Sequence, residues 1–157
     1  MGKEIERKFL VNEKLTKVLK TAESKYCNQS YLSTDENKVV RVRVLGEKGF
    51  LTIKSKVEGI SRHEFEYEIP ISDAKKMIAL FGQNVIEKTR YLIPYENHTW
   101  EVDVFEGENK GLVIAEIELQ SEDESFSIPN WIAKEVTGDA KYYNSNLQSK
   151  PYYSWSK

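Results

Sequence analysis

Cysteine is almost absent from this chain. Cys27 is its single cysteine, which excludes an internal disulfide and any zinc site built from several cysteines. A lone thiol is compatible with a reducing compartment. We expect Cys27 to be a free, buried side chain.

Long apolar runs are also missing. No stretch approaches the roughly 20 apolar residues that a membrane-spanning helix needs, and the amino terminus lacks the apolar core of a signal peptide. The net charge is only -2, so the chain as a whole offers no attraction for nucleic acid or for an anionic membrane. We therefore expect a cytoplasmic protein that binds neither, with an oligomeric state that the sequence leaves open.

Several common functional motifs are absent too. The chain has no G-x-x-x-x-G-K-[ST] phosphate loop, its histidines His63 and His98 lack zinc-ligand spacing, and no serine lies in a nucleophile elbow. No Pro, Gly or Ser tract divides the chain, and no long repeat is present. At 157 residues we expect one domain, residues 1–157, since single cores commonly span about 100 to 200 residues.

What the chain does contain is a series of short alternating stretches that are typical of β-strands. They cover residues 4–9, 39–45, 50–56, 61–71, 87–95, 98–106 and 112–120. The GEKG segment between the second and third stretches predicts a tight hairpin, because its two glycines, Gly46 and Gly49, can adopt positive backbone angles. We expect these neighbouring strands to pair antiparallel.

Helical spacing of apolar residues predicts a few helices between and after the strands. A first helix is expected near residues 12–22, capped by Asn12, and a second near 72–82, capped by Ser72 and ending near Gly82. Two short helices are expected in 128–138 and 139–150, the latter capped by Asp139. We expect the aromatic tail after them to pack on the outside of the fold, although the last helix and this tail could instead plug or line one tunnel end.

Charged residues within the strands are sorted by sign. One face of each alternating stretch carries them, and the RVR and KSK segments are purely basic, whereas EFEYE, EVD and EIE are purely acidic. Like charges two residues apart on one face repel each other. Such sorting costs stability unless an opposite charge or an ion faces each block. A solvated outer sheet face is the alternative reading.

The opposite faces of the same strands are apolar, and the predicted helices could cover them. We therefore predict an α+β fold: a closed antiparallel β-barrel of about eight strands, with the charged rows in its lumen and helices packed outside. Arg and Lys in such a lumen suit a chain of phosphates. Carboxylates without His or Cys neighbours suit a hard cation such as Mg²⁺ or Mn²⁺.

The strand rows resemble those of a known family. EIERK at residues 4–8 matches the E-x-E-x-K signature of the CYTH, or triphosphate tunnel metalloenzyme, superfamily, and RVR, TIK, R-x-E-x-E, KTR, EVDVF and EIE follow in the family's order. This superfamily includes class IV adenylyl cyclases, thiamine triphosphatases and bacterial inorganic triphosphatases. The resemblance covers about residues 3–119, and the chain is similar to the short bacterial members.

The resemblance implies roles for individual residues. The implied triphosphate-binding residues are Lys8, Arg41, Arg43, Lys54, Arg62, Lys88 and Arg90. The implied metal-binding residues are Glu4, Glu6, Glu64, Asp103, Glu116 and Glu118. The implied catalytic residues are Lys8, Glu6, Glu118 and Tyr31, where Tyr31 has a buried core role as its alternative. Lys56 and Glu68 are expected at the tunnel mouth.

The function that these features favour is metal-dependent hydrolysis of a triphosphate, with inorganic tripolyphosphate as the expected substrate and Mg²⁺ or Mn²⁺ as the cofactor. Cyclisation of ATP to cyclic AMP and hydrolysis of thiamine or nucleoside triphosphates are alternatives of the same enzyme class. A binding module that holds polyphosphate without cleaving it is the contrasting alternative. The acidic rows argue against that module, because carboxylates beside the phosphates weaken anion binding.

Overall fold

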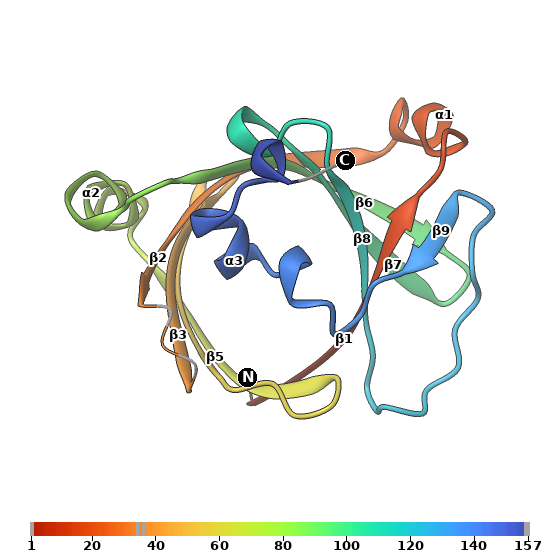
Figure 1. The fold of residues 1–157 in the computed structure, drawn as a ribbon, viewed down its shortest axis with the longest axis horizontal. Coiled ribbons are helices and arrows are strands. Elements are labelled where there is room, and N and C mark those ends of the chain that lie inside the picture. Colours follow the sequence, from red (N-terminus) through yellow and green to blue (C-terminus); the bar gives the residue numbers. More distant parts are fainter. Residues whose placement is uncertain (1, 34, 36, 156–157) are drawn as a thin grey trace.

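The fold is an antiparallel β-barrel with three α-helices (Figure 1). A computed structural model describes residues 2–33, 35 and 37–155. The strands are β1 (Gly2–Val11), β2 (Glu23–Ser33), β3 (Lys38–Leu45), β4 (Lys48–Ser55), β5 (Ser61–Ile69), β6 (Ile86–Tyr95), β7 (His98–Phe105), β8 (Val113–Glu118) and β9 (Ile132–Glu135). The α-helices are α1 (Leu15–Leu19), α2 (Ile71–Phe81) and α3 (Asn144–Ser149). Within the described residues, no helix is both long enough and apolar enough to span a bilayer.

Eight strands close the barrel. They follow the order β5-β4-β3-β2-β6-β7-β8-β1, and pairing of β1 with β5 closes the ring. Every pairing is antiparallel. Strand β9 adds to the edge of β1 outside this ring. The predicted eight-stranded barrel is therefore confirmed, with one additional strand.

The alternation along each strand separates the inside of the barrel from the outside. Outward apolar residues of β1, β7 and β8 form the largest core, in which Trp100 packs edge-on against Phe9 and Trp131. A second outer core lies between β3 and α2, where Val42 and Ala74 are fully buried. Both cores hold covering segments against the barrel wall, which leaves the charged face of each strand for the lumen.

The two glycines of the β3–β4 hairpin have different roles. Gly46 adopts the predicted positive φ of 60° in the β3–β4 turn, whereas Gly49 does not have a positive φ and lies within β4. A Cβ atom at Gly49 would be 2.7 Å from the Ala74 Cβ, so this glycine allows α2 to approach the sheet closely. Helix α2 begins after Pro70 and not at Ser72, and Gly82 follows its end as predicted.

The carboxyl-terminal part of the chain differs from the prediction. Residues 132–135, expected to be helical, form β9, because their backbone pairs with the free edge of β1. Helix α3 lies inside the ring of strands in Figure 1, not on its outside. Its Leu147 is 1% exposed and packs among lumen residues that include Tyr31, Ile86 and Phe105. Helix α3 and this apolar cluster therefore fill one end of the barrel, which we call the closed end.

The aromatic tail packs at the same closed end. Trp155 contacts the rings of Tyr142 and Tyr152 edge-on, with centroid distances of 5.3 and 5.1 Å. Tyr152 and Trp155 both adjoin the apolar cluster around Leu147. The expectation that the tail packs away from the tunnel ends was therefore wrong. Asp139 does cap the turn that precedes α3, since its carboxylate accepts a hydrogen bond from the Lys141 N–H.

Strand β2 is the element that the sequence did not reveal. The helix expected over residues 12–22 is limited to Leu15–Leu19. Its N-cap is Lys14 and not the predicted Asn12, whose side chain instead accepts a hydrogen bond from the Lys14 N–H before the helix begins. The chain then continues directly into β2, which pairs with β3 and β6. Cys27 in this strand is a free thiol and fully buried, as expected.

Candidate active site

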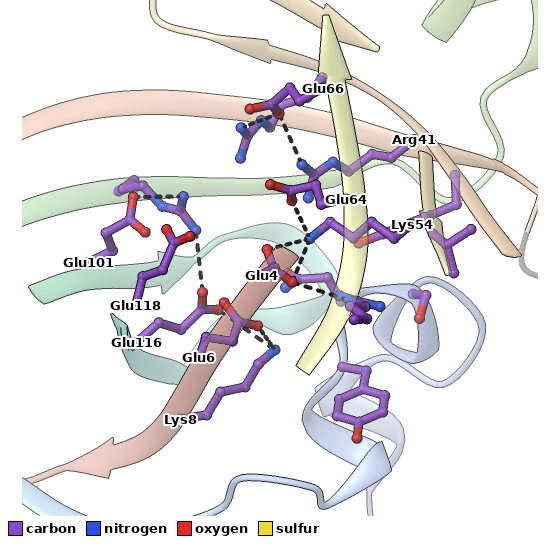
Figure 2. A pocket seen from close by; sticks show the side chains of 18 of the residues that line it. Glu4, Glu6, Lys8, Arg41, Lys54, Glu64, Glu66, Glu101, Glu116 and Glu118 are labelled. Atoms are coloured by element: carbon purple, nitrogen blue, oxygen red, sulfur yellow. Dashed lines mark hydrogen bonds and ion pairs between the residues drawn. The ribbon is translucent and has the colours of Figure 1, made fainter. Parts of the chain in front are cut away.

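A cavity of about 150 Å³ lies in the barrel lumen and is lined almost entirely by charged and polar side chains. All the predicted site residues except Asp103 line it: Glu4, Glu6, Lys8, Tyr31, Arg41, Arg43, Lys54, Arg62, Glu64, Lys88, Arg90, Glu116 and Glu118. These side chains come from seven strands, and those that Figure 2 labels point toward one another. The structure thus brings the sequence-predicted set together in one place.

The sorting of charge by sign has a structural explanation in the strand register. Basic rows lie beside acidic rows of neighbouring strands: Lys54 pairs with Glu64, and Arg90 with Asp103. Paired residues on adjacent antiparallel strands project to the same face. Several like-charged rows are therefore compensated by the neighbouring strand, as at Lys54–Glu64 and Arg90–Asp103, whereas Glu6 lies opposite Glu118. The solvated outer face considered for these rows is excluded, because they point inward.

Two arginines of β3 form one basic group in the cavity. Glu66 accepts hydrogen bonds from Arg43 Nη2 at 3.1 Å and from Thr52 Oγ1 at 2.9 Å, and lies 3.5 Å from Arg41 Nη2. The buried Nε atoms of Arg41 and Arg43 have no hydrogen-bond partner among the described residues. Burial and the charges of Arg41 and Arg90 lower the pKa of Arg43. This group therefore concentrates positive charge at the cavity wall, where it can attract an anion.

A second basic group lies on β4 and β5, around Glu4. Lys54 Nζ is 3.0 Å from Glu4 and 3.2 Å from Glu64, and Arg62 Nε is 3.1 Å from Glu4. Burial acts to raise the pKa of Glu4, but the charges of Lys54 and Arg62, with a hydrogen bond from Glu64, lower it well below its usual range. Glu4 is therefore a carboxylate, while burial and the nearby Glu4 charge raise the pKa of Glu64.

The third basic group is the most deeply buried. Asp103 is fully buried and accepts hydrogen bonds from Lys88 Nζ at 2.7 Å and from Arg90 Nε and Nη2 at 2.8 and 2.9 Å. Burial opposes the charge of this carboxyl, but Arg90 and Lys88 lower its pKa well below the usual range. Both Asp103 oxygens already contact cations. In this structure Asp103 therefore acts as a clamp that holds Lys88 and Arg90 in place.

Three glutamates form an acidic cluster beside Lys8, comprising Glu6, Glu116 and Glu118 (Figure 2). Glu6 lies directly across from Glu118 in the β1–β8 register. Burial and the charges of Glu116 and Glu4 raise the pKa of Glu6 to about 8. Lys8 Nζ is 3.7 Å from Glu116 and 3.8 Å from Glu6. Arg90 Nη2 also lies 3.9 Å from Glu116, so two cations face three carboxyl groups, and the acidic cluster keeps an excess of acidic groups.

That excess charge bears on metal binding. Within the part of the chain that the structure describes, no three or more His, Cys, Asp or Glu side chains are arranged as a metal site. The donor set nevertheless fits a hard divalent cation, because it consists of carboxyl oxygens, and because burial together with the charges of Glu116 and Glu4 raises the Glu6 pKa. A cation beside Glu6 would offset the charges of Glu116 and Glu4.

Replacing Glu6 by Gln should stabilise the metal-free protein above neutral pH. The Glu6 pKa rises from 4.5 to about 8 on folding, so between these values the folded protein retains a proton that the unfolded chain has lost. Raising the pH through that window therefore lowers the free energy of unfolding, and Gln avoids this loss. Thermal melts in chelator should show a Tm higher by about 2–5 °C at pH 8.5, and a smaller difference at pH 5.

The control for this experiment is Glu47→Gln, which removes the same charge from an exposed turn. Its Tm should stay close to that of the wild type at both pH values. A Glu6→Gln protein that is less stable than the wild type at pH 8.5 would contradict the assigned repulsion within the acidic cluster.

Several cavity residues were not among the predicted site residues. Glu66 and Glu101 line the cavity from β5 and β7, and Glu101 is 3.1 Å from Arg90 Nη1. Both belong to the acidic rows, so their alternation was a signal that could have identified them. Tyr143, Asn144 and Ser145 line the cavity from the start of α3. These three residues were missed, because α3 was expected on the outside of the barrel.

The closed barrel with inward basic and acidic rows places the chain in a defined class. Residues 2–149 match the CYTH domain family, and the chain belongs to that family, which confirms the resemblance seen in the strand rows. It is 51% identical, over the full length of both chains, to a protein named inorganic triphosphatase from Acetivibrio thermocellus. It is 36% identical to an inorganic triphosphatase from Nitrosomonas europaea, over 92% of this chain and 95% of that one.

Solved structures agree with this placement. The crystal structure of an inorganic triphosphatase aligns with a TM-score of 0.63 and 32% identity, over 92% of this chain and 93% of that chain. A putative adenylate cyclase from Bacillus halodurans also aligns with a TM-score of 0.63, over 78% of this chain, but at 22% identity. The latter likeness concerns the fold alone.

Proposed function

We propose that this protein is a metal-dependent inorganic triphosphatase that hydrolyses tripolyphosphate to pyrophosphate and phosphate. The observation that carries the proposal is the composition of the cavity, where basic side chains with unused donors lie beside an acidic cluster in one buried space. The full-length relatives named inorganic triphosphatase support the same substrate. The enzyme reading is also favoured over a binding module, because so many carboxylates beside the phosphates would weaken plain anion binding.

The basic groups would bind and orient the substrate. Arg41 and Arg43 present planar guanidinium groups that can contact two phosphate oxygens each, whereas Lys54 and Lys88 act as point charges. Because these side chains are already fixed by Glu66, Glu4 and Asp103, little reorganisation is needed when negative charge develops. Such preorganised donors stabilise a phosphoryl-transfer transition state. Arg62 and Arg90 add charge around them.

The acidic cluster would handle the attacking water. Burial and the charges of Glu4 and Glu64 raise the pKa of Glu118, which favours acceptance of a proton from water at neutral pH. We assign Glu6, together with Glu4, Glu64 and Glu116, to binding of Mg²⁺ or Mn²⁺, whose Lewis acidity would polarise phosphoryl oxygens. Lys8 lies beside this cluster and would stabilise charge on the reacting phosphoryl group. Tyr31, at the cavity wall, would contact the same group.

Phosphate release from tripolyphosphate should vanish in excess chelator and return with Mg²⁺ or Mn²⁺. The reason is that uncompensated carboxylates in the acidic cluster repel the substrate until a cation is bound. The measurement is phosphate release by the metal-stripped protein, with and without each ion. Full activity after metal stripping would contradict the proposed metal dependence.

A parallel assay with ATP tests the proposed preference for tripolyphosphate as the substrate. We expect tripolyphosphate to be cleaved faster than ATP, because the cavity has many phosphate-binding donors and no set of side chains identified as binding adenine or ribose. Cyclic AMP formation from ATP that outpaces phosphate release from tripolyphosphate, under the same metal concentration, would favour the cyclase alternative instead.

A further inference from the structure

The inference concerns Asn144, the first residue of α3, and it rests on the proposed function. Asn144 lines the same cavity as the predicted phosphate-binding residues, although it belongs to the segment that fills the closed end. Its Oδ1 accepts a hydrogen bond from Lys88 Nζ at 3.3 Å. A neutral amide is thus placed among charged side chains, next to one of the most deeply buried of the basic residues.

The position of Asn144 is fixed from two sides. Gln148, one turn later in α3, accepts a hydrogen bond from the Tyr31 N–H at 2.8 Å and so ties the helix to β2. On the preceding side, the Tyr143 ring lies 5.5 Å from Lys8 Nζ. With Leu147 buried in the apolar cluster of the closed end, the amide of Asn144 is held by the packing of α3 and is not a loose surface group.

The hydrogen bond to Lys88 decides how the amide is oriented. A lysine ammonium has donors only, so it must contact the carbonyl oxygen of Asn144 and leaves the amide nitrogen on the other side. Among the described residues, the structure gives that nitrogen no hydrogen-bond acceptor. Lys88 itself donates to Asp103 and Asn144, which leaves one of its three N–H groups for a ligand. Lys88 and Asn144 thus each keep one donor without a partner among the described residues, and both residues line the cavity.

We propose that Asn144 is a substrate-contacting residue at the closed end of the cavity: its carbonyl oxygen positions Lys88 and its amide nitrogen donates to an oxygen of the terminal phosphate. A donor without charge strengthens phosphate binding there without adding to the repulsion among Arg41, Arg43 and Lys88. The closed end thereby contributes to substrate binding as well as to the stability of the barrel.

Two substitutions separate the two roles. Asn144→Asp keeps an oxygen acceptor for Lys88 but replaces the donor by a negative charge, whereas Asn144→Ala removes both. If the amide donates to phosphate, Asn144→Ala should lower kcat/KM for tripolyphosphate by about 10-fold, and Asn144→Asp by about 100-fold or more. The loss should fall mainly on KM. Ser149→Ala, which removes an exposed hydroxyl bonded only within α3, is the matched control and should resemble the wild type.

Binding of tripolyphosphate by titration calorimetry, together with Tm, completes the test. The inference is supported if the affinity decreases from the wild type to Asn144→Ala and again to Asn144→Asp, while the Tm values stay near that of the wild type. An Asn144→Asp protein that is at least as active and as tightly binding as Asn144→Ala would overturn it, because the amide would then serve only to hold Lys88. If the Asp variant folds poorly, Asn144→Ala decides alone, and activity within about twofold of the wild type overturns the inference.

The calorimetric readout also separates this inference from the proposed function. A wild-type protein that binds tripolyphosphate but releases no phosphate contradicts the proposed hydrolysis, while the same order of affinities still supports the role of Asn144. A wild-type protein that does not bind tripolyphosphate contradicts both.

Discussion

Replacing Arg41 by Ala is expected to lower kcat/KM for tripolyphosphate by about 100-fold or more, with little change in Tm. Arg41 is 7% exposed, lines the cavity, and has a buried Nε without a partner among the described residues. Its removal therefore deletes a donor that is already in place for the anion. Because Arg43 stays beside Glu66, the charge of that carboxylate remains compensated and the barrel should fold.

Arg7→Ala is the matched control for Arg41→Ala. It removes the same side chain and the same charge, but Arg7 lies on the outer face of β1, where it pairs with Glu135 at 2.7 Å. Loss of a partly exposed pair of this kind costs at most about 1 kcal/mol of stability. Phosphate release should therefore stay within about twofold of the wild type. An Arg41→Ala enzyme as active as Arg7→Ala would contradict the role given to the basic group on β3.

The inward rows were predictable because two independent patterns coincide in them. Alternation assigns Arg41 and Arg43 to one face of a strand, and the sign sorting indicates that this face meets opposite charge. The register then places Glu66 across from Thr52, within reach of both arginines. Local sequence is sufficient for this reasoning, because strand alternation is a local property.

Strand β2 could not be recognised in the same way. Its lumen positions include Cys27 and Gln29, and the residues between them are also polar, so neither face is distinctly apolar or charged. The strand is defined by its two neighbours, since β3 and β6 pair with it on either side. Strand β9 is a similar case, because its pairing with the edge of β1 is a contact between distant parts of the chain.

The closed end was missed although the sequence carries a signal for it. Ile86, Phe105 and Ile114 occupy positions of the same parity as Lys88, Asp103 and Glu116, so they lie on the face that was predicted to be charged. Each lies at or near one end of its strand, and in the fold they gather with Leu147 in a single apolar cluster. Apolar residues at the ends of otherwise charged rows therefore indicate that another segment enters the lumen there.

Replacing Asp103 by Ala is expected to have the largest effect on stability. Asp103 is fully buried and is the shared counterion of Lys88 and Arg90. Its removal leaves two buried cations with reduced compensation, and such a loss typically lowers the free energy of unfolding by about 3–5 kcal/mol. Denaturant titration of the metal-free protein measures this change. Glu135→Ala, which removes a carboxylate from a partly exposed pair with Arg7, should lower it by less than about 1 kcal/mol.

Tripolyphosphate should restore part of the stability that Asp103→Ala loses. The substrate brings negative charge to the side of the cavity where Lys88 and Arg90 lie, and a ligand that binds only the folded state raises its stability. The rise in Tm on adding tripolyphosphate should therefore be larger for Asp103→Ala than for the wild type. If Asp103 instead served chiefly to hold a metal ion, its removal would leave the stability of the metal-free protein nearly unchanged and would weaken only the stabilisation by Mg²⁺. That result would contradict the clamp on Lys88 and Arg90.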